Sequence, residues 1–154
     1  MRTVLVDTNL LVLLVVGLAD PKLIEKHKRT QAFSSDDFML FGLFLERYEQ
    51  IVVTPGILAE TSNLLRQTGE PARSALLAQL MVLIDGAAEV HITGRTAAAC
   101  PRFLQLGLTD CSILEATKAA EHLVTVDLDL YVEAARTGLP VTNFNHLRQE
   151  HLLS

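Results

Sequence analysis

The sequence contains no tryptophan, and aromatic residues of all kinds make up only 5% of the chain. Stacked aromatic side chains are the usual platform for single-stranded nucleic acid, so a binding surface of that type is not expected. Glycine and proline are also sparse, with eight and five copies among 154 residues. Because 49% of the residues are hydrophobic, the composition excludes a disordered chain and predicts a well-filled core.

Cysteine is nearly absent as well. Cys100 and Cys111 are the only two, and neither belongs to a C-x-x-C pair, which argues against a disulfide framework or a zinc site. They suit buried thiols in a reducing compartment. The longest apolar run, residues 10–19, is too short to span a bilayer. We therefore expect a cytoplasmic protein that does not associate with membranes.

Positive charge is in deficit, with 13 basic and 18 acidic residues and a net charge of −5. Bulk electrostatics therefore does not favour binding to nucleic acid. The densest basic run consists of Lys22, Lys26, His27, Lys28 and Arg29. This run is interpreted either as a contact for an RNA backbone or as a solvated helix face. Nothing in the sequence ranks the scattered cations Arg66, Arg73, Arg95 and Lys118, so the RNA-binding residues are left unassigned.

Short β-branched runs alternate with helical segments along the chain. The pattern predicts strands at residues 3–6, 51–53, 90–92, 123–126 and 140–142. Helices are predicted over residues 8–16, 55–66, 72–84, 96–106, 109–121 and 128–136, and from Asp20 and Ser35 onward. This alternation predicts an α/β domain over residues 1–154, with a mainly parallel sheet covered on both faces and a helical insertion around residues 20–50.

Four acidic residues are expected to meet at one edge of that sheet. Asp7 and Asp127 each end a predicted strand, Asp110 follows the predicted cap Thr109, and Glu60 lies in the second turn after Pro55. Ligands of parallel α/β sheets bind outside the carboxyl ends of the strands. The order of these residues therefore predicts an acidic pocket at that edge.

Such a pocket is unfavourable without cations, because two carboxylates about 4 Å apart repel by roughly 4 kcal/mol at an effective dielectric near 20. Ligation by oxygen alone favours Mg²⁺ or Mn²⁺ over zinc. Such ions lower the pKa of a bound water and stabilise the attacking and leaving oxygens of a phosphodiester.

Each acid also has a purely structural interpretation. Asp127 is a suitable N-cap, Asp110 suits the first turn of a helix, and glutamates such as Glu60 are usually exposed. Asp7 is harder to explain in this way, since a charge that closes a buried apolar strand needs partners.

Five segments carry a resemblance to a known family. They are VDTNLL at 6–11, TPGILAETSNLL at 54–65, LTD at 108–110, LVTVDLDL at 123–130 and GLPVTN at 138–143. In this order they resemble the motifs of PIN-domain nucleases along essentially the whole chain. The resemblance implies a three-layer α/β/α fold and an endoribonuclease that uses Mg²⁺ or Mn²⁺.

The resemblance also implies roles for single residues. Asp7, Glu60, Asp110 and Asp127 would be the catalytic residues, as metal ligands or as groups that orient metal-bound water, with Asp129 beside Asp127 as a further ligand. Thr8, Asn9 and Thr125 match small polar positions that support the carboxylates or the substrate phosphate, although these three also suit caps and turns.

Stand-alone proteins of this size resemble VapC-type toxins, which implies a small antitoxin protein as partner and a homodimer. The sequence departs from the most compact members by the longer stretch between Asp7 and Glu60.

Other α/β folds fit less well. A phosphatase of the haloacid dehalogenase type needs a second aspartate where Asn9 stands, and a nucleotide-binding domain needs a glycine-rich loop, while residues 7–16 contain no glycine. The main alternative is a PIN-like binding module or complex subunit with weak catalysis.

Overall fold

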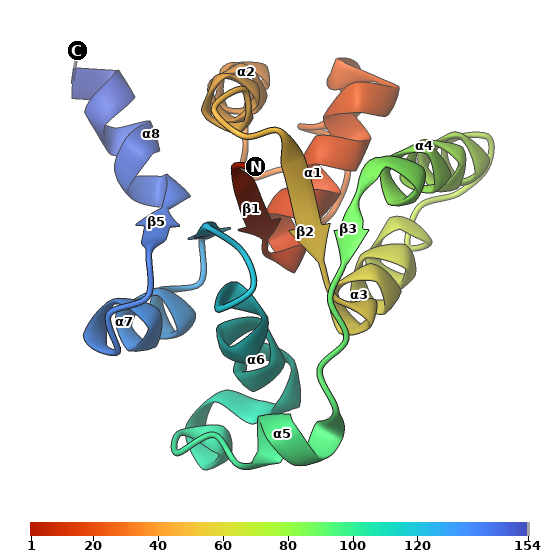
Figure 1. Ribbon diagram of the computed structural model, residues 1–154. Helices are drawn as coiled ribbons and strands as arrows, with labels where there is room; N and C mark the ends of the chain where they lie inside the picture. The colour runs from red at the N-terminus through yellow and green to blue at the C-terminus, as the bar shows by residue number, and fades with distance from the viewer. Residues whose placement is uncertain (154) are drawn as a thin grey trace.

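The computed structural model describes residues 1–153, and Figure 1 shows their arrangement. The strands are β1 (Thr3–Val6), β2 (Gln50–Val53), β3 (Ala88–Glu89), β4 (His122–Thr125) and β5 (Val141–Asn143). The helices are α1 (Thr8–Ala19), α2 (Ser35–Leu45), α3 (Pro55–Leu65), α4 (Ala72–Gly86), α5 (Gly94–Ala98), α6 (Phe103–Thr117), α7 (Leu128–Arg136) and α8 (Phe144–Leu153), with a short 3₁₀ helix η1 (Pro21–Leu23).

The five strands form one sheet in the order β3-β2-β1-β4-β5, and all neighbours are parallel. Helices flank this sheet in a three-layer α/β/α arrangement, which confirms the predicted fold class (Figure 1). Within residues 1–153, no helix has the length and apolar character needed to cross a membrane.

The centre of the molecule is built from β1 and α1, which follow each other directly. Val4, Leu5 and Val6 are fully buried because β1 lies in the middle of the sheet. Helix α1 is apolar on nearly all sides, and it packs against α2, α3 and α4. Gly17 allows α2 to approach closely, since a Cβ there would lie 2.3 Å from the ring of Phe38. The buried strand β1 and the packing of α1 on α2, α3 and α4 therefore fix the start of α1 at the carboxyl edge of the sheet.

Four strands turn sharply into helices at this edge, and the turns after β1, β2 and β4 each have their own cap. Asp7 caps α1, Thr54 caps α3 ahead of Pro55, and Asp127 caps α7. Because the strands are parallel, all three helices begin on the same side of the molecule. This geometry gathers polar side chains from segments that are far apart in the sequence.

The segment after α1 differs from the prediction. Asp20 caps only the three residues of η1, and residues 24–33 form no helix. Every third side chain of this segment is buried, namely Ile24, His27, Thr30 and Phe33. A spacing of three does not match the 3.6-residue period of an α-helix, and the Thr30 hydroxyl donates to the Ile24 carbonyl at 2.6 Å. The insertion is thus helical only in η1 and α2.

Three further expectations were wrong in detail. The strand predicted at residues 90–92 lies at Ala88–Glu89, although Val90 still donates its N–H to Val53. The helix predicted at residues 96–106 is divided between α5 and the first turn of α6, while the second part of α6 starts after Gly107, close to the predicted start at Thr109. The helix α8 was not predicted at all; its sequence has no strongly apolar face, and it is held by Phe144 at its first position.

Candidate functional site

Asp7 lies at the end of β1 and is 7% exposed. Its Oδ1 accepts a hydrogen bond from the Thr8 N–H at 2.7 Å, and its Oδ2 accepts one from the Thr125 hydroxyl at 2.6 Å. Burial raises the pKa of Asp7 above its usual value; the two hydrogen bonds lower it, and the charges of Asp127 and Glu60 raise it. Two hydrogen bonds therefore fix the orientation of the Asp7 carboxylate, while the charges of Asp127 and Glu60 repel its negative charge.

Thr125 connects Asp7 to Asp127. The parallel register pairs Val6 with Val124, which places the next residue of each strand side by side. The fully buried Thr125 hydroxyl donates to Asp7 and accepts the N–H of Asp127 at 2.9 Å. One hydroxyl has a single donor and two acceptor sites, so this arrangement uses it in both roles. Oδ1 of Asp127 also accepts the Leu130 N–H at 3.1 Å, which is its capping bond for α7.

Glu60 reaches the same edge from α3, where its side chain is exposed. Its Oε2 accepts a hydrogen bond from the buried Thr8 hydroxyl at 3.3 Å. Thr8 therefore contacts two acids, Asp7 through its N–H and Glu60 through its hydroxyl. The hydrogen bond from Thr8 to Glu60 therefore connects the start of α1 to α3, across 52 positions of the sequence.

Asp110 approaches from α6 and is half-buried. Its pKa is raised to about 7 by burial and then by the charges of four other acids, Asp127, Asp7, Glu60 and Asp129 in order of size. The chain reaches this position through Gly107, whose φ of 83° and ψ of −178° redirect α6 just before Asp110. Asp110 is therefore electrostatically coupled to every other predicted ligand.

The structure thus gathers Asp7, Glu60, Asp110 and Asp127 at one edge of the sheet, with Asp129 exposed nearby on α7. Asn9 is exposed on the first turn of α1, and no hydrogen bond links it to the acids. Among residues 1–153, no three His, Cys, Asp or Glu side chains are already arranged as a group that could hold a metal ion.

The chemistry of this set still fits a hard divalent cation. The donors are all oxygen atoms, and the charged neighbours that contribute most to the pKa shifts of Asp7 and Asp110 are other carboxylates. A cation is the group that would relieve both the burial penalty and the repulsion. The residues present therefore suit Mg²⁺ or Mn²⁺ better than a zinc ion, which prefers nitrogen and sulfur ligands.

Asn143 is a polar residue at this edge to which the sequence analysis gave no role. It ends β5, is buried, and pairs in register with Thr125. Its Oδ1 accepts the Asn145 N–H at 2.9 Å, so it caps the start of α8. The signal in the sequence was the Val141-Thr142-Asn143 run, where a polar residue closes a strand as in Asp7 and Asp127.

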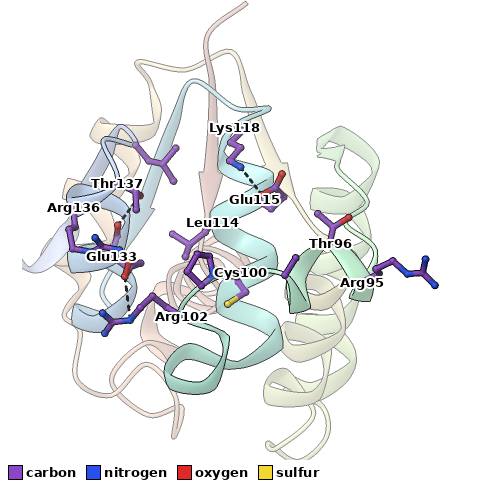
Figure 2. A pocket seen from close by; sticks show the side chains of 14 residues that line it. Arg95, Thr96, Cys100, Arg102, Leu114, Glu115, Lys118, Glu133, Arg136 and Thr137 are labelled. Atoms are coloured by element: carbon purple, nitrogen blue, oxygen red, sulfur yellow. Dashed lines mark hydrogen bonds and ion pairs between the residues drawn. The ribbon is translucent and has the colours of Figure 1, made fainter.

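A cavity of about 710 Å³ is lined by residues of α5, α6 and α7 and of the loops adjoining them, and none of these acids is among its lining residues (Figure 2). Its wall includes the buried Glu133, which is paired with Arg102 at 3.7 Å and with Arg136. Cys100 and Cys111 are free thiols that also line it, and Cys111 is buried as expected. Burial and the neighbouring thiol raise the pKa of Cys111 to about 12, so it stays protonated and unreactive.

In comparisons with known proteins, no family model matches the chain and no curated protein matches it.

Proposed function

We propose that this protein is a PIN-type endoribonuclease that hydrolyses RNA phosphodiester bonds with the help of Mg²⁺ or Mn²⁺. The observation that carries the proposal is the convergence of acids from distant segments, in which the buried Thr125 hydroxyl links Asp7 to Asp127 and the buried Thr8 hydroxyl holds Glu60. Burial and the neighbouring carboxylates raise the pKa of Asp7 and of Asp110, in agreement with this convergence. Strongly perturbed acids that converge at the carboxyl edge of a parallel sheet are typical of a functional site.

In the proposed site, Asp7, Glu60, Asp110 and Asp127 hold the cation, and Asp129 supports Asp127. When bound, the cation supplies an activated water and stabilises the charge that develops on the phosphate oxygens. Thr125 fixes the rotamer of the Asp7 carboxylate, and Thr8 positions Glu60. Asp110, whose pKa is raised to about 7 by burial and by the other acids, would hold the cation in its deprotonated form.

The proposal is tested by the cleavage of a mixed RNA pool with Mn²⁺, with and without EDTA. Asp7→Asn keeps the shape of the side chain but removes its charge, so we expect at least about a hundredfold loss of cleavage, as for other essential catalytic groups. Because the burial penalty of the charge is also removed, the melting temperature should stay the same or rise.

Asp85→Asn is the matched control, since Asp85 is an exposed acid on α4, away from the carboxyl edge. It should leave cleavage unchanged. Cleavage that persists in EDTA, or an Asp7→Asn variant as active as Asp85→Asn, would contradict the proposal. The absence of cleavage of any RNA by the wild type would instead favour a PIN-like binding module or complex subunit.

Three wider proposals rest on the family resemblance and on the free thiols. They are a small antitoxin that blocks the acidic site, a homodimer, and a cytoplasmic location, which suits two cysteines left reduced. Light scattering of the purified protein tests the dimer. Co-expression with the product of a short neighbouring reading frame tests the antitoxin.

A further inference from the structure

The cations of this chain are concentrated in two segments, residues 22–33 and 66–73. Together these contain six basic residues and two acids, a net charge of +4, which leaves −9 on the rest of the chain. The two segments are joined in space, because Arg29 Nε donates to Gln67 Oε1 at 2.9 Å. Lys26, Lys28, Arg29 and Arg66 are all exposed there. We call these four residues the distal basic surface.

The distal basic surface is rigidly built. Its lysines alternate with the buried anchors Ile24, His27 and Thr30, so the backbone presents them outward. The Thr30 hydroxyl closes the segment onto Ile24 at 2.6 Å, and the Arg29 N–H donates to His27 Nδ1 at 3.1 Å. This corrects one expectation, since His27 is 6% exposed and belongs to the core rather than to the basic surface.

The charges of this surface are not neutralised within the molecule. Among the described residues 1–153, none of its four cations forms an ion pair with a carboxylate, whereas Arg2, Arg102, Lys118, Arg136 and Arg148 do. Glu25 and Glu70 are the two acids in these segments, and Glu70 accepts a hydrogen bond from Ser74 instead. The surface is therefore available to an external anion.

The surface also lacks the apolar contacts that a protein partner would use. No large hydrophobic residue is exposed between residues 19 and 38 or between residues 44 and 80 of the described chain. Protein interfaces have an apolar centre that is depleted in charge, whereas contacts to a nucleic-acid backbone are cationic and polar. The composition of the surface therefore favours the phosphate backbone of a nucleic acid over a protein partner.

The surface lies at the far end of the molecule from the acids. Helices α1 and α3 begin at the carboxyl edge of the sheet and lead away from the arrowheads of β1 and β2 in Figure 1. The basic segments follow their last residues, Ala19 and Leu65. A helix of twelve residues spans about 18 Å, which exceeds five stacked nucleotides at about 3.4 Å each. A stacked RNA of four nucleotides is shorter than this span.

We propose that the distal basic surface binds the phosphate backbone of RNA at a distance from the acidic site, so that long RNAs are held at two places. The proposal rests on the nuclease function for its biological meaning, but the binding itself is testable without cleavage. The surface favours substrates long enough to extend from the acidic edge to the other end of the sheet.

The test measures the binding of a 30-nucleotide RNA by fluorescence anisotropy in EDTA, with Asp7→Asn as the background protein. Lys26→Ala/Lys28→Ala should weaken binding about tenfold at low salt and reduce the log–log salt slope by about 1.4, which corresponds to two phosphate contacts on a single strand. Arg95→Ala/Lys118→Ala is the matched control, because it removes the same charge from exposed positions elsewhere. It should leave both quantities unchanged.

A second arm uses the active protein with Mn²⁺ and compares this RNA with a four-nucleotide RNA. At subsaturating RNA concentration, Lys26→Ala/Lys28→Ala should lose cleavage of the 30-nucleotide RNA and retain cleavage of the four-nucleotide RNA. Equal effects of the two variant pairs on binding would overturn the proposal, as would tighter binding of an oligoglutamate peptide than of RNA at the same surface. If the lysine variant loses binding while the wild type cleaves nothing, only the nuclease function fails.

Discussion

At the scale of single residues, the site depends on hydroxyl groups as much as on acids. Thr8 and Thr125 are both buried, and each contacts two of the acidic residues. The family resemblance placed them among supporting positions, but the sequence left open whether they were only caps or turns. The structure shows why they sit there, since the register between β1 and β4 brings Thr125 beside Asp7.

Replacing Thr125 by valine should separate the role of its hydroxyl from its shape. The variant keeps the volume but leaves the Asp127 N–H without its acceptor and Asp7 without its donor. We expect a loss of about 1 to 3 kcal/mol in the free energy of unfolding and a large fall in cleavage. Thr125→Ser should restore most of both. Urea denaturation and the RNA assay measure these effects, and full activity in Thr125→Val would count against the positioning role.

The raised pKa of Asp110 makes a prediction for metal-free protein. Between pH 4 and 7 the folded state holds a proton on Asp110 that the unfolded state has lost, because the pKa rises from 3.8 to about 7 on folding. The contribution of Asp110 to the free energy of unfolding therefore falls as the pH rises through that range, and it is constant above about pH 8. Asp7 acts in the same direction, since its pKa is also raised.

The comparison of Asp110→Asn with the wild type isolates this contribution. In EDTA, the melting temperature of the variant relative to the wild type should increase from pH 5 to pH 8, as the wild type acquires an unfavourable charge that the variant lacks. Each 1 kcal/mol corresponds to about 2 to 4 °C for a chain of this size. A difference that does not change with pH would mean that Asp110 titrates normally.

At the scale of elements, the strand-to-helix turns were the most predictable part of the fold. Buried β-branched runs that end in a capping residue identified β1 with α1, β2 with α3 and β4 with α7. The segment 24–33 was not predictable in the same way, because a burial period of three comes from its packing on the core and not from helical propensity. The break in α6 at Gly107 falls in the gap between the predicted helices 96–106 and 109–121. The break between α5 and α6 was missed.

Gly107 is the element-level residue on which the placement of Asp110 depends. Its φ of 83° with ψ near 180° belongs to a region used almost only by glycine, and a Cβ there would contact nothing within 4 Å. Gly107→Ala should therefore cost about 1 to 3 kcal/mol through backbone strain alone and should reduce cleavage by moving Asp110. Gly94→Ala, where there is equally open space and no positive φ, is the control. Equal stability of the two variants would show that Gly107 is not a constraint.

At the scale of the whole molecule, the proposed acidic site and the distal basic surface lie at different places in the fold. The carboxyl edge of the sheet collects the acids, and the segments that follow α1 and α3 collect unpaired cations. The net charge of −5 conceals the local excess of basic residues in these segments. Convergence of the acids followed from the parallel sheet and could be expected from the sequence; the joining of residues 22–33 to residues 66–73 could not, because it depends on loop packing.

We propose that acids from four distant segments form one divalent-cation site. Calorimetric titration of the metal-free protein with Mn²⁺ at pH 8 tests it most directly, with Asp7→Asn and Asp85→Asn measured in parallel. Saturable binding is expected for the wild type and for Asp85→Asn, with loss of binding in Asp7→Asn. Absence of binding to the wild type, or undiminished binding to Asp7→Asn, would contradict it.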